Sequence, residues 1–271
     1  MAEYRYPKTE HQRAWIHELE QASFDGDLES TLTLRQCYLE GKAGLQADPG
    51  QALRYTKLAA RQGDPRSMYH TAVIEYSQGR FDTSARWMIR SWRAGIREAS
   101  FGLARAYAYG RGLSQDLERA LDLLEEAQQF DVEPEQRPQL KEWVLQQLAA
   151  RLEKNGQHRE AVRVLESGQL PGTAMTLAQL EPENRKARLQ QAADGGLGDA
   201  MYQLALLEPE NSQAYFEQIR NAAKAGCQKA WQPLAQCYGQ KGIHPDRGQA
   251  QRWKVSAICG KEQSALGRKK N

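Results

Sequence analysis

The same order of small, aromatic and glycine residues recurs along the chain, and this repetition constrains the fold more than any other feature. The clearest unit runs through Gly95, Ala99, Leu103, Ala104, Tyr107, Gly110, Gly112, Leu113, Asp116, Ala120, Leu124 and Ala127. A similar order returns between residues 226 and 260 and, with one more loop residue, between residues 26 and 63. A period of about 30 to 40 residues predicts a stack of similar units, each of which buries its apolar face against its neighbours.

Each unit has the features of two helices joined by a turn. Ala99, Leu103 and Tyr107 recur every four residues, so they share one face of a helix. The glycines after them supply the left-handed conformation that ends a helix. An aspartate then follows in a position to cap the next helix, at Asp48, Asp116 and Asp246. Each unit is therefore predicted to be an antiparallel pair of helices.

Composition supports a helical chain. Ala, Leu and Gln number 36, 29 and 29, whereas Val, Ile and Thr together number 21. This balance favours helices over sheets and argues strongly against an all-β fold. The apolar stretches are far shorter than a membrane helix, and residues 1–30 carry charges throughout with no apolar signal-peptide core. We therefore expect a soluble, cytoplasmic protein.

The repeated pattern resembles the Sel1-like repeat, a relative of the tetratricopeptide repeat. The resemblance implies an all-α fold, an α-solenoid of antiparallel helix pairs that forms a curved superhelix with a concave, partner-binding face. Some secreted relatives are cysteine-rich, disulfide-bonded and linked to β-lactam binding. This chain lacks a cysteine pair in every repeat, so that activity is not transferred to it.

The pattern divides the chain into five predicted segments. A capping helix at 1–22 precedes three Sel1-like units over 23–130, at about 23–63, 63–95 and 95–130. An irregular connection with a tetratricopeptide-like helix pair follows at 131–170, then shortened and full Sel1-like units at 171–260, and a basic, disordered tail at 261–271. In the first segment, Trp15, Leu19 and Ala22 are spaced to form the apolar face of the capping helix.

No combination of side chains in the sequence indicates catalysis. Among the five histidines, His11 and His17 are six residues apart, which places them on different faces of a helix. There is no Gly-x-x-x-x-Gly-Lys-Ser/Thr phosphate loop. We expect all four cysteines to be reduced, and the spacing of Cys227, Cys237 and Cys259 matches no zinc signature, so we expect these three to be core residues. We therefore predict no catalytic residues, no metal site and no cofactor.

Four arginines stand out by their spacing. Arg86, Arg90, Arg93 and Arg97 are placed at i, i+4, i+7 and i+11, as on one continuous stripe of a helix. The guanidinium fork suits carboxylates, phosphates and aromatic rings. The sequence allows two interpretations of this stripe. The arginines either form a solvated helix face beside core aromatic residues or line part of a groove for an acidic partner.

The architecture favours a bacterial interaction protein, a non-enzymatic adaptor or regulator that holds a partner protein or peptide in the solenoid groove. Besides the arginine stripe, the predicted contact residues lie at exposed positions of the first helices: Tyr69, Tyr76, Arg105, Tyr109, Tyr202 and Trp231. One alternative is a nucleic-acid-binding protein that uses the stripe and the basic tail. An enzyme is the other alternative.

Overall fold

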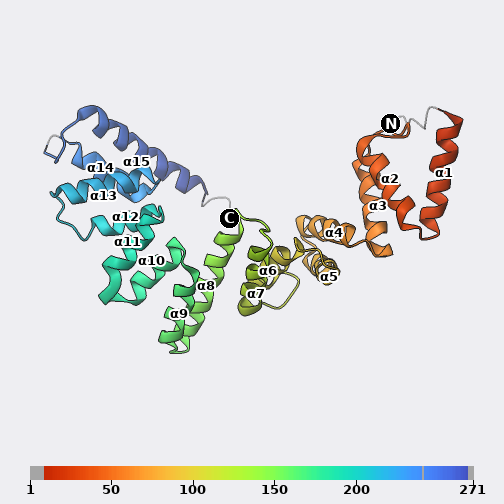
Figure 1. The fold of residues 1–271 in the computed structure, drawn as a ribbon. Helices are drawn as coiled ribbons and strands as arrows, with labels where there is room; N and C mark the ends of the chain where they lie inside the picture. Colours follow the sequence, from red (N-terminus) through yellow and green to blue (C-terminus); the bar gives the residue numbers. More distant parts are fainter. Residues whose placement is uncertain (1–8, 240, 268–271) are drawn as a thin grey trace. The chain divides into compact units, whose positions relative to one another are not determined.

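The computed structural model describes residues 9–239 and 241–267, with side chains as far as residue 258. These residues form fifteen α-helices and two short 3-10 helices, and this described part contains no strand (Figure 1). The prediction of an all-helical chain of paired helices is confirmed. The chain divides into two compact units, Met1–Val144 and Leu145–Asn271, with the boundary inside helix α8 (Arg137–Lys154).

The first unit is a capping helix followed by three helix pairs. Its elements are α1 (Glu10–Phe24), then α2 (Leu28–Glu40) with α3 (Pro49–Gln62), α4 (Pro65–Ser77) with α5 (Phe81–Arg93), and α6 (Ala99–Tyr109) with α7 (Leu117–Gln129). The two helices of each pair pack along each other, and the second helix of a pair also packs on the first helix of the next pair. Each pair therefore completes the core of its neighbour.

The second unit repeats this arrangement, and α9 to α14 are mostly shorter than the helices of the first unit. Its elements after α8 are α9 (His158–Gly168), α10 (Pro171–Leu180), α11 (Arg185–Asp194), α12 (Gly198–Ala205), α13 (Gln213–Lys224), α14 (Trp231–Cys237) and α15 (Arg247–Gly267), with 3-10 helices at Pro182–Asn184 and Gln228–Ala230. Helix α15 continues to Gly267, past residue 261 where a disordered tail was predicted to begin. Residues 268–271 of that tail lie outside the described residues.

The predicted caps form as expected. The carboxylate of Asp48 accepts hydrogen bonds from the amides of Gly50 and Gln51 at 2.8 and 3.0 Å. Asp116 and Asp246 each accept an amide hydrogen bond at 3.0 Å in the first turn of the helix that follows them. These local signals position both helices of each unit before any tertiary contact is considered.

The capping helix packs through a face that includes the predicted Leu19 but not the predicted Trp15. Ile16 and Ser23 are buried, whereas Trp15 is exposed. The Ser23 hydroxyl lies 2.7 Å from the Thr31 hydroxyl of α2. Leu19 packs against the same cluster as Ile16, so the buried face of α1 is offset by one residue from the face that contains Trp15.

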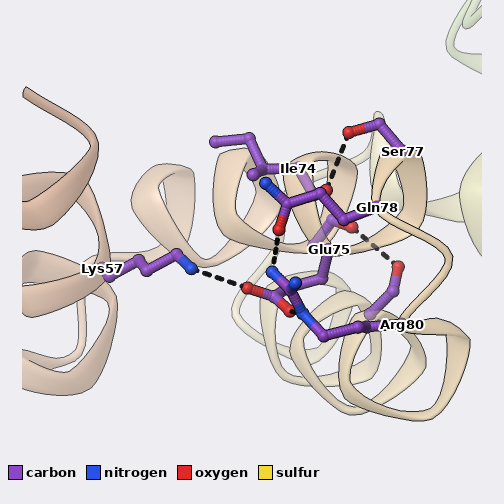
Figure 2. A network of polar contacts seen from close by, with 8 residues as sticks. Lys57, Ile74, Glu75, Ser77, Gln78 and Arg80 are labelled. Atoms are coloured by element: carbon purple, nitrogen blue, oxygen red, sulfur yellow. Dashed lines mark hydrogen bonds and ion pairs between the residues drawn. The ribbon is translucent and has the colours of Figure 1, made fainter. Parts of the chain in front are cut away.

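A buried carboxylate links three elements of the first unit. Glu75 of α4 lies 2.9 Å from Lys57 Nζ of α3 and pairs with Arg80 just before α5, as Figure 2 shows. Arg80 also contacts Gln78 in the same turn. The hydrogen bond from Arg80, followed by that from Lys57, outweighs burial and lowers the pKa of Glu75 to about 2. The ionised form is therefore the one that stabilises this junction.

The Glu75 network predicts a specific acid sensitivity. The pKa of Glu75 in the folded protein lies below the ordinary 4.5. The stabilisation that the ionised Glu75 provides is therefore complete above about pH 4.5 and is lost as the pH falls towards 2. Glu75→Gln should lower the free energy of unfolding by about 1–2 kcal/mol at pH 7, and the loss of stability between pH 4.5 and 2 should become shallower. Urea unfolding at stepped pH measures both effects, with Glu125→Gln, an exposed glutamate of α7, as the control. Parallel pH profiles for the wild type and Glu75→Gln would contradict this assignment.

Candidate interaction site

Aromatic and arginine side chains from successive repeats meet on one surface of the first unit. We name this surface the tyrosine–arginine patch and define it by Tyr69, Tyr76, Phe81, Arg105, Tyr109, Arg111 and Trp143. Tyr69 and Tyr76 are separated by two turns of α4, and Arg105 and Tyr109 by one turn of α6. The first helices of two consecutive pairs therefore each present one face to the patch.

Tyr76 is the central contact of the patch. The guanidinium carbon of Arg105 lies 4.1 Å from the centroid of the Tyr76 ring. Arg111 Nη1 donates a hydrogen bond of 2.9 Å to the Tyr76 hydroxyl. The ring of Phe81 meets the Tyr76 ring edge-on, with centroids 5.1 Å apart. One tyrosine thus contacts two arginines from different segments of the chain.

The turn between α6 and α7 holds Arg111 in place. Gly110 and Gly112 have φ values of +64° and +76°, a left-handed conformation that glycine adopts without strain. A Cβ on Gly112 would lie 2.2 Å from the carbonyl oxygen of Phe81, so this turn packs backbone against backbone on the start of α5. A hollow of about 390 Å³ lies between these two turns, lined by residues 79–83 and 110–112.

The patch continues as an aromatic surface. Tyr109 remains 42% exposed, and its ring centroid lies 4.7 Å from that of Trp143 in α8. Tyr69, at the other end, is half-buried, and burial together with Glu133 and Glu98 raises its pKa while Arg105 lowers it. The acidic side chains therefore lie at the Tyr69 end, and Arg111 lies near the exposed ring of Tyr109 at 5.5 Å.

The structure brings together three of the predicted contact residues, Tyr76, Arg105 and Tyr109. Tyr69 lies two turns before Tyr76 on α4, and the charge of Arg105 lowers its pKa. Tyr202 and Trp231 lie in the second unit instead, where both are half-buried against the core cluster around Phe216 and Leu234. Their packing accounts for most of their surface, which leaves their proposed partner contacts without geometric support.

The predicted four-residue arginine stripe is wrong, because the helix ends before its last member. Helix α5 ends at Arg93, and Gly95 adopts a φ of +92°. Arg97 lies in the following turn, where it pairs with Glu126 at 3.2 Å and stacks on Phe130 at 4.5 Å. The remaining stripe consists of three exposed arginines on α5, Arg86, Arg90 and Arg93. The guanidinium carbon of Arg90 lies 4.7 Å from the centroid of the Trp87 ring.

Three residues of the patch were not predicted as contact residues. Phe81 begins α5 directly after the turn at Gly79, and Arg111 lies in the turn between Gly110 and Gly112, so the glycines beside them indicate only where helices end. The arginine between Gly110 and Gly112 was an available signal, since a side chain between two such glycines projects from a fixed turn. Trp143 lies in a different predicted segment, and no local pattern indicates its contact with Tyr109.

The described residues meet the requirements of neither a metal site nor a reactive cysteine. No three His, Cys, Asp or Glu side chains among the described residues come close enough to hold a metal ion. Burial raises the pKa of each described cysteine thiol, at Cys37, Cys227 and Cys237. A reactive cysteine requires the opposite shift. The side chain of Cys259 lies outside the described residues.

None of the described helices combines the length and the hydropathy that a membrane crossing requires.

The Sel1 repeat family matches the sequence at residues 36–64 and 97–127. These two segments are Sel1 repeats. The first matched Sel1 repeat contains the Asp48 cap, and the second contributes three patch residues, Arg105, Tyr109 and Arg111.

Several solved structures resemble the chain, and the first of those described here shares its fold. A Sel1 repeat protein from Oxalobacter formigenes is 18% identical, with a TM-score of 0.59 over 98% of this chain and 83% of that chain. An immunity protein from Pseudomonas aeruginosa is 18% identical, with a TM-score of 0.36 over 72% of this chain and 81% of that chain. A protective antigen present in uropathogenic Escherichia coli strains is 17% identical, with a TM-score of 0.40 over 90% of this chain. This chain spans 64% of that antigen. No curated protein matches the sequence.

Proposed function

We propose that the protein is a non-enzymatic, cytoplasmic adaptor that binds a segment of a partner protein across the tyrosine–arginine patch. Sel1 repeats are generally protein-interaction scaffolds. The observation that carries the proposal is the convergence of Tyr76, Arg105, Tyr109 and Arg111 from two consecutive repeats. Tyrosine and arginine are the residue types enriched in the energetic centres of interfaces.

The patch has the rigidity that such a site needs. Tyr76 is held by ring contacts with Phe81 and Arg105, and its hydroxyl is fixed by Arg111. Tyr109 is held by Trp143 while part of its ring stays exposed. Side chains that are fixed before binding lose little conformational entropy when a partner arrives, so more of the contact energy contributes to affinity.

The proposal predicts the effect of truncating one exposed ring. We expect Tyr109→Ala to weaken the affinity for the captured partner about tenfold, because an exposed aromatic anchor of an interface contributes about 1–2 kcal/mol. Phe130→Ala is the matched control, since Phe130 is 45% exposed in the same unit and lies outside the patch. The measurement is capture from nuclease-treated lysate, identification by mass spectrometry and titration of the strongest captured protein. Equal affinities for the two variants would contradict the proposal.

Nucleic-acid binding is a second candidate, favoured by the three exposed arginines of α5 beside Trp87. Guanidinium groups that follow one helix face can contact successive phosphates. The same capture experiment separates the two candidates when a variant with Arg86, Arg90 and Arg93 changed to Glu is included. Material that is lost both on nuclease treatment and in this variant supports nucleic-acid binding. A protein that is still captured after nuclease treatment, both by the wild type and by the triple variant, supports the adaptor.

A further inference from the structure

Two arginines of the patch share one tyrosine without a carboxylate to balance them. Arg105 lies over the Tyr76 ring at 4.1 Å, and Arg111 binds the Tyr76 hydroxyl at 2.9 Å. Among the described residues neither arginine has a salt bridge, whereas Arg80, Arg97 and Arg188 each pair with a glutamate. The patch therefore holds two arginines that form no ion pair within the described part of the protein.

The protein leaves hydrogen-bonding capacity unused at the same place. Arg105 Nε is buried and has no acceptor among the described residues. Cation–π contacts and a neutral hydroxyl position the two guanidinium groups, but they do not neutralise the charge. A planar guanidinium fork binds a carboxylate through two parallel hydrogen bonds. A carboxylate from a bound segment that paired with the two guanidinium groups would supply the opposite charge that no ion pair among the described residues provides.

The charges around the patch favour a short acidic segment over a uniformly charged polymer. Glu75, the acid nearest to Tyr76 in the sequence, is occupied by Lys57 and Arg80. Glu98 and Glu133 act on Tyr69, at the far end from Arg111. A nucleic acid that followed the whole patch would place phosphates against these acids, whereas a protein segment can place one carboxylate at the arginines.

An apolar surface adjoins the two arginines. Arg111 lies 5.5 Å from the ring of Tyr109, which in turn packs on Trp143. Since Tyr109 stays partly exposed, an apolar side chain of a bound segment can cover it and remove its surface from water. The arrangement therefore offers two adjacent contacts of different chemistry, one for a carboxylate and one for an apolar group.

We propose that the tyrosine–arginine patch recognises an acidic segment of a partner protein, with one carboxylate bound between Arg105 and Arg111 and a neighbouring apolar side chain against Tyr109 and Trp143. This inference rests on the proposed function and specifies the chemistry of the segment. Tyr76 acts as the positioning residue, because it holds both arginines.

The test selects peptides of about twelve residues from a random display library on the immobilised full-length protein. We expect Asp and Glu to be enriched about twofold or more over the unselected library. The strongest peptide is then labelled, and its affinity is measured by fluorescence anisotropy. Changing its Asp and Glu residues to Asn and Gln should weaken binding to the wild type about tenfold or more. This peptide change leaves the protein untouched, so a folding defect cannot imitate its effect.

Variants of the protein locate the carboxylate. The double variant Arg105→Gln, Arg111→Gln should lose about tenfold in affinity for the acidic peptide and about twofold or less for the neutral version. Arg119→Gln is the matched control, since Arg119 also lies over a tyrosine, 5.1 Å from the Tyr107 ring centroid, and stands outside the patch. Compared with Arg105→Gln, the variant Arg105→Lys should retain more of the affinity for the acidic peptide, because it keeps the positive charge and loses only the planar fork.

Several results would overturn the inference. Selected peptides without acidic enrichment that still lose affinity with Tyr109→Ala would retain the proposed function and reject the carboxylate site. Failure to enrich any peptide would also reject the proposal that the patch binds an acidic segment. A phosphoserine peptide that binds about tenfold better than its glutamate counterpart would replace carboxylate by phosphate chemistry. A single-stranded oligonucleotide that displaces the peptide through Arg105 and Arg111 would favour nucleic acid instead.

Discussion

Gly112→Ala is expected to lower the free energy of unfolding by about 3 kcal/mol, which combines backbone strain with overpacking. Gly112 has a φ of +76°, where any side chain is strained. Its added Cβ would lie 2.2 Å from the Phe81 carbonyl oxygen and 2.9 Å from the Asp82 nitrogen. Both are backbone atoms at the start of α5, so they cannot rotate away as a flexible side chain would.

The matched control for this substitution lies in the neighbouring repeat. Gly79 has a φ of +75°, and a Cβ there would have no atom within 4 Å. Gly79→Ala therefore isolates the backbone strain, and we expect a loss of about 1 kcal/mol. Urea unfolding followed by circular dichroism measures both variants. If the two alanines cost the same, the close packing of the α6–α7 turn on α5 contributes nothing measurable.

Leu34→Ala is expected to destabilise the protein by about 3 kcal/mol, the usual cost of a cavity in a close-packed core. Leu34 of α2 is 0% exposed and lies in a cluster with Ile16, Tyr38 and Tyr55. Those neighbours come from the capping helix and from both helices of the first pair, so the cavity would form where three helices meet. Rigid ring packing, with Tyr38 and Tyr55 stacked at 5.6 Å, limits how far the cluster can collapse.

The control for Leu34→Ala lies on the same helix. Leu39 of α2 is 53% exposed, so Leu39→Ala removes the same atoms from a largely solvated position. We expect a change of about 0.5 kcal/mol or less. Urea unfolding provides the comparison. A large loss for Leu39→Ala would show that this face of α2 is covered, in contradiction to the structure.

The helix pairs could be predicted because their signals are local. Asp116 caps α7 through an amide three residues away, and Gly110 ends α6 by its own backbone conformation. Such interactions depend on adjacent residues, so their spacing in the sequence is sufficient. The fold class follows once the same signals recur in successive units.

The two errors in helix faces have equally local origins. Spacing alone could not decide between Trp15 and Ile16, since a rotation of α1 by one residue places either on the apolar side. The periodic spacing of Arg97 was real, but Gly95 had already ended the helix. A count of residues predicts a common face only while the helix continues.

The patch could be predicted only in part. Tyr76 and Arg105 were expected at exposed positions of first helices, but their contact joins residues from different repeats. Trp143 of α8 contacts Tyr109 of α6, and no spacing within either helix specifies this contact. The pairing of Arg111 with the Tyr76 hydroxyl likewise depends on how two turns meet in space.

The end signals at the junction between the first two helix pairs are local, and this has a consequence for how such chains change length. Asp48 begins the second helix of one pair, and Gly63 ends it before Asp64 begins the next. Because each of these caps lies directly beside the helix that it defines, duplication or deletion of a whole pair leaves these helix ends unchanged. An ancestral gene could therefore lengthen or shorten this protein by complete units, and the binding surface along the first helices would gain or lose one segment each time.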